Sequence, residues 1–190
     1  MEPDRKAALR TAAVAARRTL RTGERAIASQ AIVERLRVLP ELREARVVLL
    51  YAALAEEADV SALIGPLHRR GARTIFPRVS GDRLELVAAS DLRTLQLGYR
   101  GIREPVGPTV DAASIDAVIT PGVAFDPHGG RLGQGGGHYD RLLSSMPGEA
   151  VRVGVCFACQ VVPDVPREDH DLPVDLVVTE RAVYRTDARR

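Results

Sequence analysis

Residues 121–142 read Pro121-Gly-Val-Ala-Phe-Asp-Pro-His-Gly-Gly-Arg-Leu-Gly-Gln-Gly-Gly-Gly-His-Tyr-Asp-Arg-Leu142. Six of the nine residues from 129 to 137 are glycine. The apolar run 115–120 before this stretch predicts a buried strand. Apolar side chains follow the stretch at the one-turn spacings of a helix, namely Tyr139, Leu142 and Leu143. The predicted order is therefore strand, glycine-rich loop and helix.

This order suits the binding of an anion such as a phosphate group. Glycine lets backbone N–H groups turn toward an anion without a Cβ in the way, and the first turn of a helix adds unpaired N–H groups and a positive dipole end. Arg131 and Arg141 flank the loop and can each hold phosphate oxygens. Asp140 can serve as a Mg²⁺ ligand beside such a phosphate. Glycine runs also occur as plain turns or linkers, and the residues alone leave that alternative open.

The stretch matches neither of the two common phosphate-binding motifs. It has no Gly-Lys-Ser or Gly-Lys-Thr, as a P-loop requires, and His138 stands where the dinucleotide-binding pattern needs its last glycine. The loop therefore indicates phosphate binding without identifying the class of ligand.

The composition is that of a soluble globular protein. The chain has 190 residues with 45% apolar and 27% charged side chains, which predicts one domain over residues 1–190. A net charge of +2 and an aromatic content of 4% give no reason to expect a nucleic-acid partner. No run of 18 apolar residues and no apolar N-terminal core are present, so we expect a cytoplasmic protein without a membrane partner. The oligomeric state stays open.

The N-terminal segment predicts a helix over residues 5–20. Its apolar stripe consists of Leu9, Ala13, Ala16 and Leu20, and the basic residues Lys6, Arg10, Arg17 and Arg18 lie off the stripe. Lys6 is the only lysine of the chain. A compact ammonium suits phosphate, although the composition alone favours a solvated helix face.

Strands and helices alternate along the rest of the chain. Further helices are expected over residues 22–39 and 61–70, and further strands over residues 46–54, 74–77, 84–88, 151–157 and 176–179. This alternation predicts an α/β fold in three layers, with a mainly parallel, mixed sheet flanked by helices. Cys156 and Cys159 lie in or just after an apolar run, without a second Cys/His pair, and read as two structural thiols rather than a redox or zinc site.

Two acidic segments are candidates for binding. Glu57 follows the expected strand 46–54, and ligands of open α/β sheets lie beyond the carboxyl ends of strands, although Glu57 also fits as an acid at a helix start. Asp171 lies between His170 and Asp175, a pattern too poor in spaced histidines for zinc. A hard-cation site shared with phosphate oxygens needs only one or two carboxylates and is the better hypothesis here.

Five separated segments together resemble the 5-formyltetrahydrofolate cyclo-ligase family, also called 5,10-methenyltetrahydrofolate synthetases. They are Lys6-x-x-Leu9-Arg10, the strand end with Glu57, Gly101-Ile-Arg-Glu-Pro105, the glycine-rich stretch, and His170-Asp171-x-x-x-Asp175. The resemblance implies a reaction in which ATP and 5-formyltetrahydrofolate give 5,10-methenyltetrahydrofolate, ADP and phosphate, with ATP as co-substrate and Mg²⁺ as cofactor. A non-catalytic folate- or nucleotide-binding paralogue and a kinase for another small molecule remain the alternatives.

The resemblance also implies roles for individual positions. ATP contacts fall on Lys6, Arg10, Arg131, Leu132, Gly133, Gln134, Gly135, Gly136, Gly137, His138 and Tyr139, with Lys6 and Arg131 acting in catalysis. Folate contacts fall on Ala52, Glu57, Gln134, Gly135, Gly136, Gly137 and His138, and the Mg²⁺ ligands on Asp140 and Asp171. This chain differs from the usual family pattern at Ala52, Val60 and His138, where a larger apolar residue, Thr and Tyr are more common.

Overall fold

The computed structural model describes residues 2–168 and 171–186. A seven-stranded sheet has the order β11-β10-β9-β6-β1-β2-β3. Its strands are β1 (Val47–Leu49), β2 (Arg73–Ser80), β3 (Arg83–Ala88), β6 (Ala117–Pro121), β9 (Val151–Val155), β10 (Leu176–Val178) and β11 (Val183–Arg185). All neighbours pair in parallel except β2 with β3 and β10 with β11. The predicted mixed, mainly parallel sheet is confirmed.

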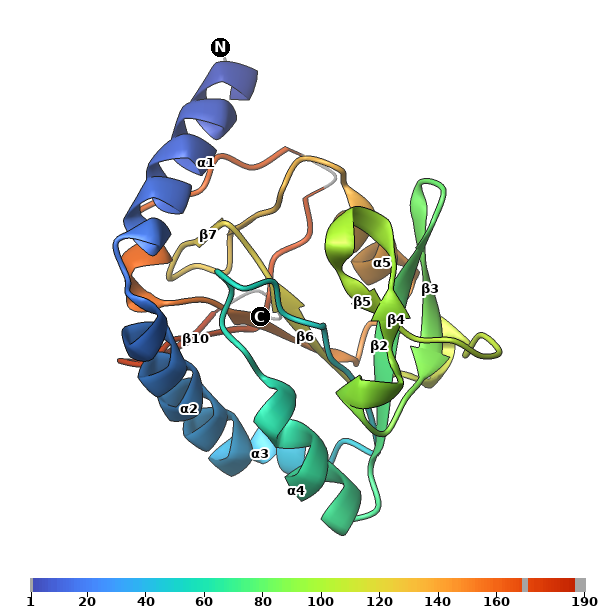
Figure 1. Ribbon diagram of the computed structural model, residues 1–190. Coiled ribbons are helices and arrows are strands. Elements are labelled where there is room, and N and C mark those ends of the chain that lie inside the picture. The colour runs from blue at the N-terminus through green and yellow to red at the C-terminus, as the bar shows by residue number, and fades with distance from the viewer. Residues whose placement is uncertain (1, 169–170, 187–190) are drawn as a thin grey trace.

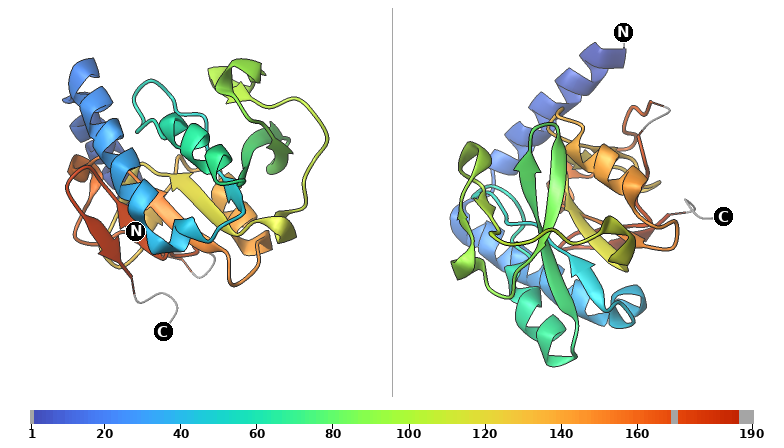
Figure 2. Two further views of the ribbon diagram at one scale, coloured as in Figure 1. Left: turned by 90° about the horizontal axis from the view of Figure 1, so that it is seen from below. Right: turned by 90° about the vertical axis from the view of Figure 1, so that its right-hand side faces the viewer.

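Helices cover both faces of this sheet. They are α1 (Glu2–Arg18), α2 (Thr22–Val38), α3 (Pro40–Arg43), α4 (Ile64–Arg69) and α5 (His138–Ser145). Figure 1 shows α1 and α2 following one another along one edge of the molecule, and the β2–β3 hairpin at the opposite edge with α5 behind it. The two views of Figure 2 show the same layers from below and from the side of that hairpin. No helix in the described part of the chain is long and apolar enough to cross a membrane.

Neighbouring residues of the central strands bury their side chains on opposite faces, as a strand requires. Val48 packs in the core cluster that includes Ile32 and Leu36 of α2, whereas Leu49 packs in the cluster that includes Leu143 of α5. The parallel strands are therefore apolar on both sides, and their carboxyl ends meet at one edge of the sheet.

Short elements lie in the connections. Two small hairpins are β4 (Gln96–Leu97) with β5 (Arg103–Glu104) and β7 (Ala124–Phe125) with β8 (Arg131–Leu132). Five 3₁₀ turns are η1 (Ser61–Leu63), η2 (Leu92–Thr94), η3 (Tyr99–Gly101), η4 (Ala112–Ser114) and η5 (Ala158–Gln160). The β7–β8 hairpin and the edge strand β11 were not among the expected elements.

The expected strand over residues 46–54 was wrong in length. β1 ends at Leu49, and the Leu50 amide makes one more bond, to the Ile75 carbonyl at 2.9 Å. Beyond it the Tyr51 hydroxyl donates a hydrogen bond to the Ala58 carbonyl, which closes residues 51–58 into a loop. The apolar run indicates burial, but Leu50 and Tyr51 are buried outside the sheet and residues 52–54 are partly buried in a loop. The expected helix 61–70 likewise divides into η1 and α4.

Candidate functional site

A buried aspartate fixes the start of the glycine-rich stretch. Asp126 is fully buried between β7 and β8, and its carboxylate accepts hydrogen bonds from the amides of His128 and Gly130 at 2.8 Å and of Val165 at 2.9 Å. A Cβ on Gly130 would lie 2.2 Å from this carboxylate, so the turn requires glycine. The segment 126–130 is thereby held at the end of the sheet.

Helix α1 packs against the next part of the stretch. Leu132 is buried in the same cluster as Ala13 of α1, so only its backbone can face a ligand. The Arg10 Nε donates a hydrogen bond to the Gly133 carbonyl at 2.9 Å. Gly135 adopts φ +97°, and a Cβ there would lie 3.8 Å from the guanidinium carbon of Arg10. The turn of the glycine-rich loop therefore faces a cation from α1.

Arg131 lies beneath the first turn of α5. Its side chain is only 3% exposed, and Nη2 donates a hydrogen bond to Asp140 Oδ1 at 2.5 Å. The guanidinium carbon lies 5.6 Å from the centre of the Tyr139 ring. The buried Nε has no hydrogen-bond partner among the described residues, so this cation retains a donor for a ligand.

Lys6 is buried as well, one helical turn before Arg10. Its Nζ lies 2.6 Å from Asp171 Oδ2 and 2.9 Å from Glu168 Oε1. Burial lowers the pKa of Lys6, but the hydrogen bonds to Asp171 and Glu168 raise it by more, so the ammonium stays charged. The expectation of a solvated helix face for this residue is wrong.

Both predicted metal ligands are thus paired with cations predicted to bind phosphate, Asp140 with Arg131 and Asp171 with Lys6. Across residues 2–168 and 171–186 no group of three or more His, Cys, Asp or Glu side chains is arranged to hold a metal. His170 lies outside the described residues. Asp175 accepts a hydrogen bond from the Arg152 amide at 2.7 Å and is thereby engaged at the start of β10.

Glu57 lies in the loop after β1 and faces the same region. Its Oε2 accepts a hydrogen bond from the Leu54 amide at 3.0 Å. Burial raises the pKa of Glu57, while the Leu54 bond and the charge of Arg17 lower it. Burial and the charge of Glu57 also raise the pKa of Tyr139, which shows that the two side chains are electrostatic neighbours. Ala52 is partly buried against the core at the start of this loop.

The remaining predicted positions surround the start of α5. Gln134, Gly135 and Gly136 are exposed, and Gly137 precedes the helix with φ +64°. The ring of His138 lies 6.4 Å from that of Tyr99, which η3 places beside the glycine-rich loop.

Sequence reasoning gave no role to several residues that shape this region, namely Arg17, Tyr51, Tyr99 and Asp126. The Phe-Asp pair after a buried strand was a usable indication for Asp126, because an acid beside an apolar run needs partners. Arg17 gave no such indication, since the sequence alone does not distinguish a buried arginine from an exposed one off the apolar stripe of a helix.

The site thus combines exposed glycine amides, three cations and two carboxylates. Backbone amides, Lys6, Arg10 and Arg131 together suit a polyanion such as a phosphate chain. Carboxylate oxygens next to such an anion are the ligands that Mg²⁺ prefers.

Comparisons with known proteins agree with this geometry. The sequence model of the 5-formyltetrahydrofolate cyclo-ligase family matches residues 2–180. The 5-formyltetrahydrofolate cyclo-ligase of Escherichia coli (strain K12) is 32% identical over 175 residues, which cover 88% of this chain and 96% of that protein. The enzyme of the same name from Mycolicibacterium smegmatis is 31% identical, covering 95% of this chain and 96% of its own.

Solved structures show the same relationship. The NMR structure of Aquifex aeolicus 5,10-methenyltetrahydrofolate synthetase superposes with a TM-score of 0.84 at 36% identity, covering 97% of this chain and 94% of that one. The Mycoplasma pneumoniae synthetase shares the fold, with a TM-score of 0.76 at 22% identity. Because the sequence match spans nearly the whole chain, the protein belongs to the 5-formyltetrahydrofolate cyclo-ligase family.

Proposed function

We propose that the protein converts 5-formyltetrahydrofolate into 5,10-methenyltetrahydrofolate, with ATP as the phosphoryl donor and release of ADP and phosphate. The observation that carries this proposal is the contact of Arg10 with Gly133, because it joins the basic face of α1 to the glycine-rich loop. A family member that binds ATP needs such a polyanion site at this loop.

The residues at the loop fit a nucleotide triphosphate. Lys6 and Arg10 are one helical turn apart on α1, so both cations face the same side. Arg131 retains a buried donor at Nε. We assign the phosphate chain to these three side chains and to the backbone of residues 132–139, with Lys6 and Arg131 stabilising charge on the transferred group.

The chemistry follows from the poor leaving ability of the formyl oxygen. That oxygen attacks the γ-phosphorus of ATP, a P–O bond forms to it, and the bond to ADP breaks. N10 of the folate then attacks the formyl carbon, the C–O bond breaks with release of phosphate, and N10 loses its proton. Phosphoryl transfer of this kind needs positioning and charge neutralisation rather than a protein nucleophile.

The two aspartates fit a Mg²⁺ ion in the chemistry of their donors, since hard carboxylate oxygens and phosphate oxygens are its usual ligands. Asp140 and Asp171 would hold the ion, and it would neutralise charge on the triphosphate. In this assignment Arg131 and Lys6 exchange their carboxylate partners for phosphate oxygens when the nucleotide binds.

Folate recognition is assigned to the loop after β1. The Glu57 carboxylate can accept two N–H bonds from one edge of the pterin ring, and Ala52 supplies an apolar wall. Gln134 to His138 lie between this loop and the nucleotide region in the proposed arrangement, where they would contact both substrates.

The decisive experiment follows the absorbance of the methenyl-folate product. We expect a rise when the protein is mixed with 5-formyltetrahydrofolate, ATP and Mg²⁺, and none when ATP or Mg²⁺ is left out. If folate binds by calorimetry but no product forms, the activity is absent and the protein is a binding paralogue.

A further inference from the structure

Arg17 is a buried cation that the proposed reaction does not use. It lies in the last turn of α1, and its side chain is 5% exposed. Its Nη2 lies 3.3 Å from Glu56 Oε2, while Nε and Nη1 are buried without a hydrogen-bond partner in the described part of the chain. Such a charge is costly to bury unless a nearby charge compensates it.

The neighbour of Arg17 gives a natural comparison. The Arg18 Nε lies 3.1 Å from the same carboxylate of Glu56, but the Arg18 side chain is 66% exposed. An exposed pair of this kind contributes little to stability. Two adjacent arginines thus share one partner, and only Arg17 reaches into the protein.

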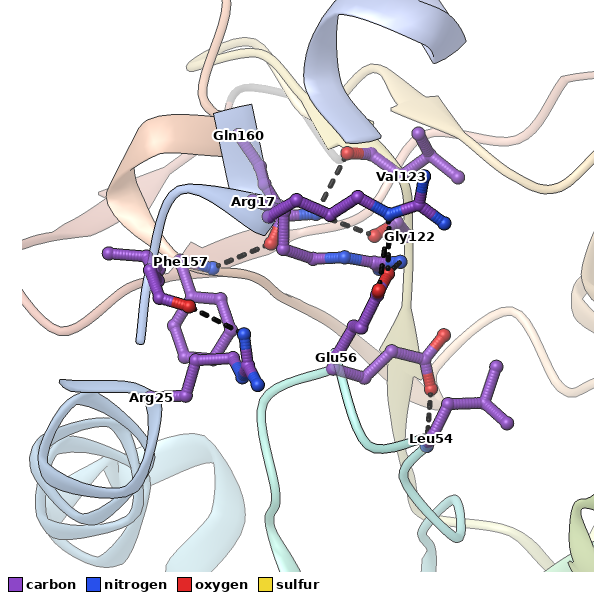
Figure 3. A network of polar contacts seen from close by, with 11 residues as sticks. Arg17, Arg25, Leu54, Glu56, Gly122, Val123, Phe157 and Gln160 are labelled. Carbon is purple, nitrogen blue, oxygen red and sulfur yellow. Dashed lines mark hydrogen bonds and ion pairs between the residues drawn. The ribbon is translucent and has the colours of Figure 1, made fainter. Parts of the chain in front are cut away.

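Arg17 is directed at the loop that carries Glu57. Figure 3 shows it beside Glu56, next to the buried Gln160, whose Nε2 donates to the carbonyls of Gly122 and Val123 at 3.1 and 2.8 Å. Other elements hold the same loop at other points, since the Asp59 amide donates to Ser29 Oγ of α2 at 3.0 Å. Arg17 supplies the buried contact from α1, and Arg18 supplies an exposed one.

Glu57 itself borders a cavity. A space of about 480 Å³ lies between α2 and the loop after β1, and Glu57, Ala53, Leu54, Arg25 and Gln30 are among its lining residues. This volume is in the range of small-molecule sites. Glu57 therefore borders a cavity, and its chain neighbour Glu56 pairs with a buried cation.

We propose that Arg17 is a positioning residue for Glu57: its ion pair with Glu56 anchors the loop and places a buried positive charge near the next residue, Glu57, whose carboxylate is assigned to accept N–H groups of the pterin. The inference rests on the proposed function, because the pterin is assigned from it. Charge is needed at this position since a neutral carboxyl group would offer a donor where two acceptors are required.

The surroundings of Glu57 support this role. Burial raises its pKa, and Arg17 is the cation that opposes this rise. Tyr51 and Tyr139 also interact with Glu57, but burial raises the pKa of both, so neither titrates near neutral pH. The charge of Arg131 lowers the pKa of Tyr139, and the charge of Asp59 raises the pKa of Tyr51. Arg25 of α2 is a further charged residue that lines the cavity.

The test compares Arg17→Gln, Arg17→Lys and the matched control Arg18→Gln. Without the positive charge the pKa of Glu57 rises, so the acid limb of kcat/KM for 5-formyltetrahydrofolate moves to higher pH. We expect Arg17→Gln to raise the KM for the folate by up to about tenfold at pH values below the pKa of Glu57, the limit for a shift of one pKa unit, with a smaller rise at higher pH and an unchanged KM for ATP. Arg17→Lys should restore most of the loss, and Arg18→Gln should match the wild type.

A second variant should shift the pKa of Glu57 in the opposite direction. Glu56 is 35% exposed, and Glu56→Gln removes a negative charge that partly neutralises Arg17. The acid limb should then move to lower pH. A pH-independent loss in Arg17→Gln, or an equal rise of both KM values, would show a merely structural role and overturn the proposal.

A measurement without turnover separates this inference from the proposed function. Carbon-13 NMR of the glutamate carboxyl groups, with Glu57→Gln for assignment, gives the pKa of Glu57 directly. It should be higher in Arg17→Gln and lower in Glu56→Gln than in the wild type. Identical titration in all three proteins would refute the coupling even in an active enzyme, whereas the predicted shifts in a protein without activity would leave the coupling and remove only the assigned substrate.

Discussion

At the level of single residues, the site is a set of cations already paired with carboxylates. Arg131 contacts Asp140, and Lys6 contacts Asp171 and Glu168. These pairs compensate buried charge in the protein without ligands. In the proposed complex, phosphate oxygens would replace these carboxylates as partners of the basic side chains, and Mg²⁺ would replace the basic side chains as the partner of the carboxylates.

We predict that Asp140→Asn lowers kcat by about 100-fold or more while the protein remains folded. The amide keeps the size of the side chain but loses the charge that pairs with Arg131 and that would hold Mg²⁺ in the proposed site, and groups that stabilise developing charge contribute on this scale. Steady-state kinetics measure the loss, and circular dichroism with thermal melting checks the fold. Unchanged turnover in a folded variant would remove Asp140 from the metal site.

The residue types of the site were the feature most easily predicted from the sequence. The glycines, Arg131 and Asp140 could be picked out because each type suits phosphate or Mg²⁺, whereas Lys6 and Arg10 were assigned through the family resemblance. Burial could not be read in the same way. Arg17 and Arg18 are adjacent and chemically identical, and only the packing of α1 on the loop after β1 makes one of them interior.

At the level of elements, the glycine-rich loop depends on backbone angles that other residues rarely adopt. We predict that Gly135→Ala raises the KM for ATP roughly tenfold, the value of one hydrogen bond to a charged group, because a Cβ would project toward Arg10. Isothermal calorimetry with a non-hydrolysable ATP analogue provides an independent affinity.

Gly81 is the matched control for this substitution. It has φ +62° in the turn between β2 and β3, and a Cβ there meets nothing within 4 Å. Both variants pay a similar conformational cost of about 1–2 kcal/mol, seen as a lower melting temperature. Only Gly135→Ala should weaken nucleotide binding, and an equal loss in Gly81→Ala would mean that general destabilisation explains the effect.

The start of α2 predicts a pH-dependent contribution to stability. Glu24 Oε2 accepts a hydrogen bond from the Arg21 amide at 2.7 Å, and Oε1 accepts one from the Arg21 guanidinium at 2.8 Å. The guanidinium bond and then the amide bond lower the pKa of Glu24 from 4.5 to about 2. A carboxyl group with a lowered pKa stabilises the fold above its ordinary pKa and loses that contribution as the pH falls.

We therefore expect Glu24→Gln to melt slightly below the wild type at pH 7, because the pair is exposed and contributes little. The difference should shrink as the pH falls from 4.5 towards about 2. Differential scanning calorimetry across this range measures it, with Glu34→Gln, whose side chain lies later in α2, as the comparison. A constant difference at every pH would contradict the assignment.

Long periodic segments predicted their elements well, and short ones did not. The two long N-terminal helices lie where their apolar patterns indicated, and so do the central strands except β1, which is much shorter than expected. β7 and β8 have two residues each and β11 has three. Such strands are too short to show an alternation of apolar and polar residues. These elements form because the rest of the chain holds them, as Asp126 does for the turn between β7 and β8.

At the level of the whole molecule, ligand binding should tighten segments that are far apart in sequence. We predict that ATP with Mg²⁺ slows amide hydrogen exchange in α1, in residues 133–140 and around residue 171, but leaves the β2–β3 hairpin unchanged. A ligand at 100 times its Kd stabilises the folded protein by about 2.7 kcal/mol. Exchange mass spectrometry measures the pattern, and AMP is the control because it lacks the phosphate chain. Protection confined to residues 133–140 would exclude α1 from the nucleotide site.

Lys6 and its partners Glu168 and Asp171 are separated by 162 and 165 residues of chain. A ribosome that adds about 5–20 residues per second releases the first helix long before it makes the acids that receive it. The nascent protein must therefore carry an exposed basic helix through most of its synthesis. The proposed nucleotide site would therefore be completed only after residues 168–171 have been synthesised.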